Sequence, residues 1–317
     1  MALELPVVDA ASLAAWCETH LGSRAESELF RAGNLTRVVG TRLADGREVV
    51  VRVRPAAPRI AACTDVQRRL FESGFPCPQP LAGPAPLGQH EATAEAYIPG
   101  VPDVPDVPGG TPLPDSGRAA QPFAAALAQL VNLAPRPEQV PSLAPAPSWA
   151  AWNHHQDGNW PSAEEAEDLD ADLNQVRGPD WLDEAGQAAR RILQASQDQL
   201  VIGHCDWMTD NLRWNGSRLL VAYDWDSLIA DSEAVIAGLA AAIYLYPALP
   251  TMTETRAFLD AYATARGRPF SPGELRRCWA AGVWTRAVDA KLEHAAGKPT
   301  AVLTQDEARE RLHQAGR

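Results

Sequence analysis

Residues 201–226 read VIGHCDWMTDNLRWNGSRLLVAYDWD, and this stretch decides the fold. Short apolar runs alternate in it with polar residues, which is typical of short strands joined by turns. Asn215-Gly216 is a strong signal for a two-residue hairpin turn between two of those runs. The stretch therefore predicts a strand, a polar loop and a hairpin that folds Val221–Tyr223 back beside Leu212–Trp214.

Three polar side chains are brought together by this hairpin. Asp206 opens the polar loop, Asn211 closes it five residues later, and Asp224 follows the second hairpin strand. Phosphoryl transfer needs a carboxylate that orients a hydroxyl, and oxygen ligands that hold Mg²⁺ on the nucleotide phosphates. In an H-x-D-x-x-x-x-N loop the Asp faces the hydroxyl and the Asn faces the metal. Ordinary turn hydrogen bonds would explain any one of these residues, but not the whole set.

The joint pattern of loop, hairpin and Asp-Trp resembles the kinase-like aminoglycoside phosphotransferase family, the small-molecule relatives of protein kinases. The resemblance implies that Asp206 is the catalytic base and that Asn211 and Asp224 hold Mg²⁺. It also implies that His204 supports the loop. Further candidates for contact with the substrate or a second metal are Asp226, Trp207 and Asp231.

The resemblance extends to an expected nucleotide-binding region near the N-terminus. In kinase-like folds the third strand carries a small apolar residue that packs on adenine and, two positions later, a Lys that grips the phosphates. Val50 and Arg52 stand at these positions, and no Lys precedes Lys291. Arg binds phosphate with a planar fork rather than a point charge. Arg54 competes for the role, and both arginines could instead face solvent.

Other parts of the expected nucleotide-binding region are assigned from their order along the chain. The Gly33–Thr36 segment, with Gly33, Asn34 and Thr36, would cover the phosphates, although an ordinary strand bulge explains it equally well. A helix over residues 63–74 has no Glu where kinases pair one with the lysine, so Asp65 is the nearest substitute. The inter-lobe hinge, with backbone contacts to adenine, would use Glu95, Ala96 and Tyr97.

Composition limits the class of protein. The chain has 317 residues, 46% apolar content and a formal net charge of −12. Such acidity argues against nucleic acid as a partner and favours a cationic acceptor. Five scattered cysteines and the lack of a signal-peptide pattern lead us to expect a cytoplasmic protein. The longest apolar run, Val235–Tyr246, is too short to span a bilayer, so no membrane partner is expected.

The expected fold is α+β in two lobes, like a protein kinase. Residues 1–94 would form a nucleotide-binding lobe with a small antiparallel sheet, residues 95–100 the hinge, and residues 101–317 a mainly helical catalytic and substrate-binding lobe. A short polar turn after Asp226 leads straight to a helix. Because protein kinases carry a long activation loop there, the acceptor is expected to be a small molecule.

The sequence therefore predicts an ATP- or GTP-dependent phosphotransferase that acts on a small-molecule hydroxyl. Members of the family it resembles phosphorylate antibiotics, choline, homoserine and sugars, so neither a resistance nor a metabolic role follows. A nucleotide-binding pseudokinase is favoured by the absent Lys and displaced Glu, and opposed by the intact Asp206, Asn211 and Asp224. A metal-dependent hydrolase built on His204, Asp206 and Asp224 is the third reading.

Overall fold

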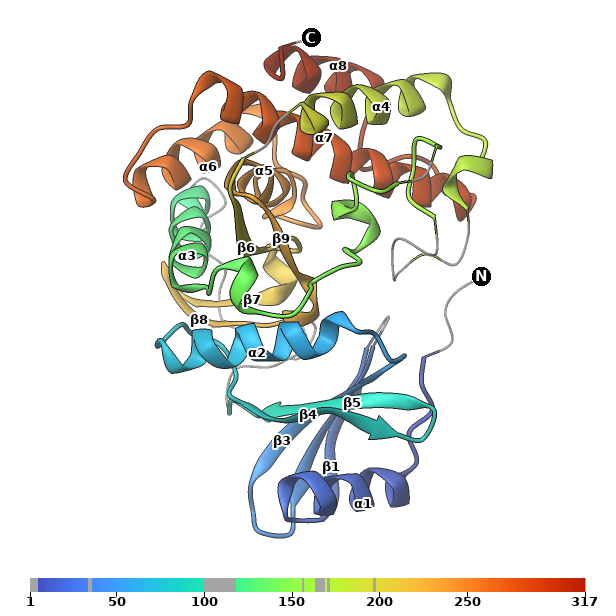
Figure 1. The fold of residues 1–317 in the computed structure, drawn as a ribbon, viewed down its shortest axis with the longest axis vertical. Coiled ribbons are helices and arrows are strands. Elements are labelled where there is room, and N and C mark those ends of the chain that lie inside the picture. Colours follow the sequence, from blue (N-terminus) through green and yellow to red (C-terminus); the bar gives the residue numbers. More distant parts are fainter. Residues whose placement is uncertain are drawn as a thin grey trace.

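The computed structural model describes residues 5–33, 36–99, 118–155, 157–162, 169, 172–195 and 198–316. Figure 1 shows two lobes, with the N-terminal sheet below and most of the helices above. The first lobe contains a five-stranded antiparallel sheet in the order β1-β2-β3-β5-β4 and two helices. Its elements are α1 (Ala10–Leu21), β1 (Ala25–Ala32), β2 (Arg37–Leu43), β3 (Glu48–Arg54), α2 (Arg59–Glu72), β4 (Pro80–Leu87) and β5 (His90–Ala96).

The alternation of β3 divides its side chains between the two faces of the sheet. Val49, Val51 and Val53 are fully buried and pack with Trp16 and Cys17 of α1. The side chains between them must point to the opposite face, since successive residues of a strand alternate. That face carries the arginines of β3 and is turned away from α1. The register is fixed because a slip of one residue would bury the arginines under α1.

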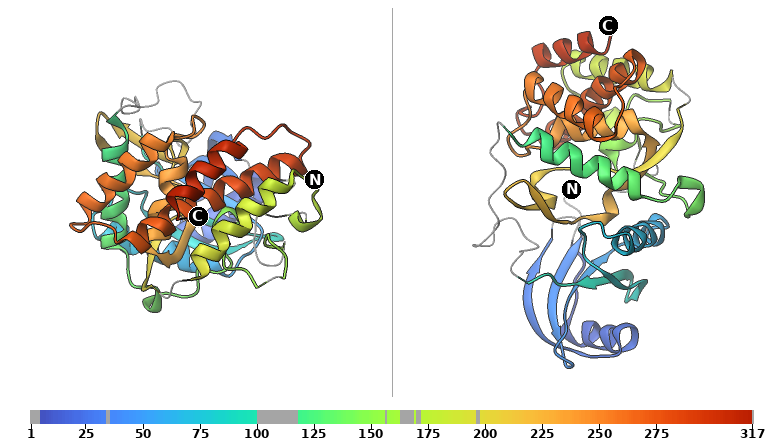
Figure 2. Two further views of the ribbon diagram at one scale, coloured as in Figure 1. Left: turned by 90° about the horizontal axis from the view of Figure 1, so that it is seen from above. Right: turned by 90° about the vertical axis from the view of Figure 1, so that its left-hand side faces the viewer.

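The second lobe is mainly helical. Its helices are α3 (Ala120–Leu133), α4 (Asp180–Gln194), α5 (Glu233–Ile243), α6 (Met252–Ala265), α7 (Pro272–Ala295) and α8 (Gln305–Gln314). Two short strand pairs lie beside them: β6 (Leu200–His204) with β9 (Leu228–Ser232), and β7 (Leu212–Asn215) with β8 (Arg218–Ala222). Single 3₁₀ turns cover Pro137–Gln139, Ser148–Ala150, Leu173–Gln175, Thr209–Asn211 and Trp225–Ser227. The two further views in Figure 2 show the lobes stacked along the long axis.

Helices α5 and α7 form the centre of this lobe. Every residue of α5 from Ala234 to Ile243 is buried. Gly238 lets α7 approach closely, because a Cβ there would lie 2.2 Å from the carbonyl oxygen of Cys278. Ser271 and Glu274 form a capping box that starts α7, as the sequence indicates. This packed core fixes the strand pairs that carry the polar loop.

The α+β, two-lobed prediction is confirmed, with local differences. Helix α2 begins at Arg59, four residues earlier than predicted. The hairpin does pair β7 with β8, but Asn215 and Arg218 are its last paired residues, so the turn is Gly216-Ser217. Gly216 adopts a φ of 57°, which glycine tolerates without strain. No helix in the described part of the chain is long and apolar enough to cross a membrane.

Candidate active site

The polar loop between β6 and β7 holds Asp206 and Asn211 together. The Asn211 side-chain nitrogen donates to the backbone oxygen and to Oδ2 of Asp206, each over 2.8 Å. A short 3₁₀ turn over Thr209–Asn211 returns the chain to β7, and Tyr223 N–H donates to the Asn211 carbonyl over 2.8 Å. Because the amide nitrogen is used in this way, the Asn211 side-chain oxygen is the atom that can ligate a cation.

His204 lies beneath the loop and is fully buried. Its Nδ1 accepts from Asp206 N–H over 3.2 Å and its Nε2 lies 3.1 Å from the Tyr223 carbonyl. An acceptor at Nδ1 requires the proton at Nε2, so Nε2–H donates to Tyr223. Burial, the main cause, lowers the pKa of His204 to about 4. The geometry therefore agrees with a supporting role for a neutral imidazole.

Asp224 follows β8 and has an unusual backbone. Its φ of 65° and ψ of 52° lie in the left-handed region, which few residues other than glycine adopt. Ser227 Oγ donates to Asp224 Oδ2 over 2.7 Å. Such strain is held at functional sites, where it directs a side chain. Here it turns the carboxylate of Asp224 toward Asp206 and Asp226, whose charges both raise its pKa.

Asp226 joins the two lobes. Its Oδ2 accepts from Arg54 Nη1, and Arg54 Nη2 donates to Thr93 Oγ1 over 3.0 Å. The other carboxylate oxygen, Oδ1, is buried and has no hydrogen-bond partner among the described residues. An orphaned buried carboxylate oxygen costs free energy unless a cation or donor reaches it. Arg54 is thus committed to a carboxylate rather than placed as a separate phosphate ligand.

The three carboxylates carry more negative charge than the site neutralises. Burial, the main cause, raises the pKa of Asp206 to about 7, although Asn211 opposes it. Burial and the charges of Asp226 and Asp206 raise the pKa of Asp224 well above its usual value. Burial acts in the same direction on Asp226, but Arg54 overcomes it and brings that pKa below its usual value. Among the described residues no three His, Cys, Asp or Glu side chains form a metal site by themselves, so a divalent cation here would also need the Asn211 oxygen and ligands from outside the chain.

Arg52 lies on the same face of β3 and has a partner that the sequence analysis did not foresee. Its Nε lies 3.1 Å from Glu95 Oε1, and both side chains are largely buried. Gln67 of α2 donates to Glu95 Oε2 over 2.9 Å. The charge of Arg52 also acts to lower the pKa of Asp224. Arg52 therefore faces the carboxylates and does not face solvent.

Asp65 does not meet Arg52. It lies on the outer side of α2, 3.0 Å from Arg69 and 3.7 Å from Arg68. Charged side chains on the exposed face of α2 thus pair with one another, at i,i+4 and i,i+3 spacings. The structure places Gln67, two residues later, on the face that looks at β3.

The turn between β1 and β2 depends on Gly33. Its φ is 123°, and a Cβ there would lie 1.8 Å from the carbonyl oxygen of Thr36. Only glycine fits such a close approach of two backbone segments. Asn34 lies outside the described residues. The predicted phosphate loop therefore has a tight backbone turn at its base, and its contact with phosphate stays a prediction.

The predicted adenine contacts lie at the end of β5. Val50 is 2% exposed and pairs across the sheet with Glu95. The N–H groups of Ala96 and Tyr97 already donate to the carbonyls of Gln79 and Glu48. Both N–H groups thus already have acceptors, and the contact of this edge with adenine stays a prediction.

Trp207 corrects one substrate-contact prediction. It is fully buried, and its Nε1 donates to the Phe123 carbonyl over 2.9 Å. The indole is part of the core, because its large apolar surface packs under α3. Asp231, the other candidate, is also buried and accepts from Trp152 Nε1 over 2.6 Å. It lines a cavity of about 210 Å³, while burial, the main cause, raises its pKa to about 6.

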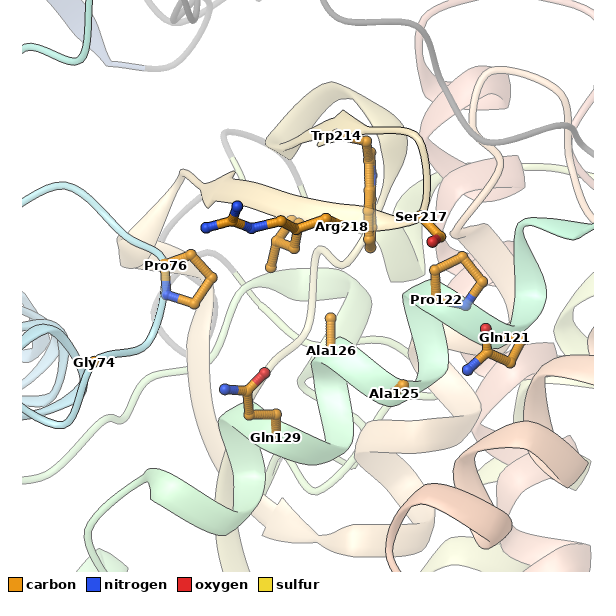
Figure 3. A pocket seen from close by; sticks show the side chains of 11 residues that line it. Gly74, Pro76, Gln121, Pro122, Ala125, Ala126, Gln129, Trp214, Ser217 and Arg218 are labelled. Carbon is orange, nitrogen blue, oxygen red and sulfur yellow. The ribbon is translucent and has the colours of Figure 1, made fainter.

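A larger cavity lies elsewhere. It has a volume of about 460 Å³, is open to solvent, and is lined by α3, the β7–β8 hairpin and the segment after α2. Figure 3 shows Trp214 of the hairpin above Ala125 and Ala126 of α3, with the Arg218 side chain extending toward Pro76. None of the three site carboxylates lines this cavity. The converging side chains, rather than this cavity, define the candidate active site.

The site can now be compared with known proteins. A model of the phosphotransferase enzyme family, abbreviated APH, matches residues 26–278, most of the chain. This chain belongs to the phosphotransferase enzyme family. It is a small-molecule kinase of that family. The matched residues include β3, α2, the polar loop and the hairpin. A search of the curated proteins finds no sequence match.

Solved structures share the fold of this phosphotransferase. Amicoumacin kinase hAmiN in complex with AMP-PNP, Ca²⁺ and Ami is 12% identical with a TM-score of 0.58, covering 91% of this chain and 86% of that one. Spectinomycin phosphotransferase in complex with ADP and spectinomycin is 12% identical with a TM-score of 0.57, covering 98% and 95%. Macrolide 2'-phosphotransferase type I is 17% identical with a TM-score of 0.56, covering 98% and 97%. At such identities the likeness establishes the fold.

Proposed function

We propose that this phosphotransferase moves the γ-phosphate of ATP or GTP to a hydroxyl of a small molecule, with Asp206 as the base. The convergence of Asp206, Asn211 and Asp224 at one end of the hairpin carries the proposal. In this proposal Asp206 aligns an acceptor hydroxyl and receives its proton. The hydrogen bond that Asn211 donates to its carboxylate supports this role.

Mg²⁺ bound with the nucleotide would neutralise phosphate charge and polarise the phosphoryl group. Asn211 and Asp224 would hold it, and Asp226, with its orphaned Oδ1, is placed to add a ligand. Among the described residues no group of three His, Cys, Asp and Glu side chains forms a metal site by itself. We therefore assign part of the coordination to the Asn211 amide and to phosphate oxygens.

The nucleotide itself would lie against β3 and β5. We assign the phosphates to Arg52 and to the Gly33–Thr36 turn, and the base to Val50 and the end of β5. The proposed nucleotide-binding lobe remains residues 1–94, the hinge residues 95–100 and the catalytic lobe residues 101–317. Gly100 lies outside the described residues. A reducing cytoplasm suits the five free, buried cysteines.

The acceptor is proposed as a small hydroxyl compound, and a cationic one is favoured by the acidic charge. Spectinomycin and Ami are the ligands in two structures of similar fold, which makes antibiotics the first panel to test. The polar Asp231 cavity beside β9 is a second place where an acceptor group could be held.

A nucleotide-consumption screen tests the function. Purified protein with Mg·ATP or Mg·GTP is offered antibiotics, amino alcohols and sugars, and products are detected by mass as a gain of one phosphate. Turnover that depends on both nucleotide and acceptor supports the proposal. Tight Mg·ATP binding with no product across the panel favours the pseudokinase, and nucleotide-independent hydrolysis favours the hydrolase. An Asp206→Asn preparation controls for a contaminating kinase.

A further inference from the structure

The acid that pairs with the β3 arginine comes from an unexpected element. Arg52 donates through Nε to Glu95 Oε1, and Glu95 belongs to β5, not to helix α2. The pair is well shielded, with side-chain exposures of 13% and 7%. Gln67 of α2 donates to the second oxygen of the same carboxylate and also to the Pro78 carbonyl. The carboxylate of Glu95 is thereby held from two sides.

Sheet register explains why these groups meet. Across β3 and β5, Val50 is opposite Glu95 and Arg52 is opposite Thr93. Arg52 and Glu95 are thus diagonal neighbours on one face, within reach of long side chains. Helix α2 covers this part of the sheet and contributes the amide of Gln67 instead of an acid. The carboxylate that pairs with Arg52 at this place therefore comes from the strand and not from the helix.

We propose that Glu95 is the positioning residue for Arg52, with Gln67 fixing Glu95, so that an acid of β5 replaces the helix acid in preparing the nucleotide site. This inference rests on the proposed function, in which Arg52 binds the nucleotide phosphates. Glu95 takes the Nε donor at the near end of the guanidinium. The guanidinium held in this way would meet phosphate oxygens in the forked geometry that Arg uses for such groups.

Physical chemistry makes Glu95 more than a packing residue. A buried arginine without a nearby anion is costly, so its side chain would turn to other acceptors if Glu95 lost its charge. The nearest acidic groups of the site include Asp224 and Asp226, both of which feel the charge of Arg52. Glu95 thus fixes the near end of the Arg52 side chain on the sheet while its charge still reaches the site carboxylates.

The test is direct binding of a non-hydrolysable ATP analogue with Mg²⁺, measured by calorimetry. Glu95→Gln keeps the size of the side chain and removes its charge, and should weaken binding about tenfold, or about 1.4 kcal/mol. Glu48→Gln is the matched control, since Glu48 starts β3 and its carboxylate pairs with exposed Arg42. It should bind within about twofold of the parent protein, because exposed pairs contribute little.

A variant cycle separates positioning from general disruption. In an Arg52→Gln background, Glu95→Gln should add no further loss, because Glu95 acts through Arg52. The exchange of Gln67→Glu with Glu95→Gln restores one negative charge to the cluster and should recover part of the affinity. If Glu95→Gln alone does not fold, the comparison of Arg52→Gln with the neutral double variant still decides the question.

Two outcomes overturn the inference without touching the proposed function. One is a parent protein that binds the analogue while Glu95→Gln binds it equally well. The other is a Glu95→Gln loss that persists in full in the Arg52→Gln background. Weakened binding in Asp65→Asn, with Glu95→Gln unchanged, would return the role to α2. A parent protein that binds no nucleotide at all contradicts the proposed function itself.

Discussion

The candidate site has two sides of opposite charge. The hairpin contributes carboxylates to one side, and strand β3 contributes arginines to the other. The hairpin side holds Asp206 and Asp224, whose pKa values burial raises. On the strand side each arginine meets an acid of its own, Arg52 with Glu95 and Arg54 with Asp226. The strand side is thus neutralised in the folded chain, whereas the hairpin side is short of positive charge. A bound cation would complete the second side, which is a reason to expect one there.

The strongest test of the hairpin side is Asp206→Asn. An amide cannot receive the proton of an acceptor hydroxyl, so we expect kcat to fall about 10²- to 10⁴-fold. The fold should persist, because the amide keeps the shape and the contact with Asn211. Steady-state turnover on the acceptor found by screening measures this. Asp210→Asn, a neighbouring carboxylate of the same loop, should retain activity, and full turnover of Asp206→Asn would refute its role as base.

The contact between the two lobes is tested at Arg59, the first residue of α2. It is fully buried and donates to the carbonyls of Leu143 and Leu228, which belong to the other lobe. Arg59→Met leaves these carbonyl oxygens without a charged donor. We expect the free energy of unfolding to fall by about 3 kcal/mol.

Urea unfolding followed by tryptophan fluorescence gives the value for Arg59→Met. The control is Arg42, an exposed arginine of β2 that pairs with Glu48 of β3. Arg42→Met should cost less than about 1 kcal/mol. Equal losses at the two positions would show that burial of the α2 arginine contributes nothing special to lobe contact.

The same two regions show what the sequence could predict. Asp206, Asn211 and Asp224 lie within one loop and hairpin, so residue spacing alone predicts their convergence, and the structure brings them together. The fold class followed as well, because the order of strands, helices and turns is local information. Glu95 and Arg52 are 43 residues apart, and their contact depends on sheet register.

Helix phase explains the choice of Asp65 over Gln67. Residue type alone favours Asp65, because Gln67 carries no charge. Residues two apart on a helix point about 200° away from each other. Asp65 therefore faces solvent when Gln67 faces the sheet. Val66 and Leu70 are buried on one stripe of α2, but an apolar stripe does not tell which of its flanks meets β3.

Arg54 and Asp226 provide a smaller test, because their contact joins the two regions. They are 172 residues apart in sequence and both largely buried. Arg54→Gln and Asp226→Asn should each destabilise the protein, since each leaves a buried charge unmatched. The double variant should lose less than the sum, with a coupling free energy of about 2 kcal/mol. Additive losses in urea unfolding would show that the pair does not hold the lobes.

The smallest effect is a pH dependence of stability without nucleotide. Asp206 has its pKa raised from 3.8 to about 7 by burial, so between these values the folded chain keeps a proton that the unfolded chain has lost. Its contribution is present below pH 3.8 and is lost as pH rises to about 7. His204 has its pKa lowered to about 4, so its contribution is present above pH 6.5 and is lost as pH falls. As pH rises, the two contributions therefore change the stability in opposite directions.

Asp206→Asn removes the pH dependence of stability that Asp206 contributes and keeps the one that His204 contributes. Relative to the parent protein, the variant should gain stability with rising pH by about 1 kcal/mol per pH unit between pH 4 and 7, and no more above pH 7. Urea unfolding of both proteins at four pH values gives the difference directly, and contributions from other groups, such as Asp231, cancel in it. Parallel curves across this range would mean that Asp206 is charged in the folded protein without a metal. The hairpin side would then already be neutralised, and the contrast with the strand side would disappear.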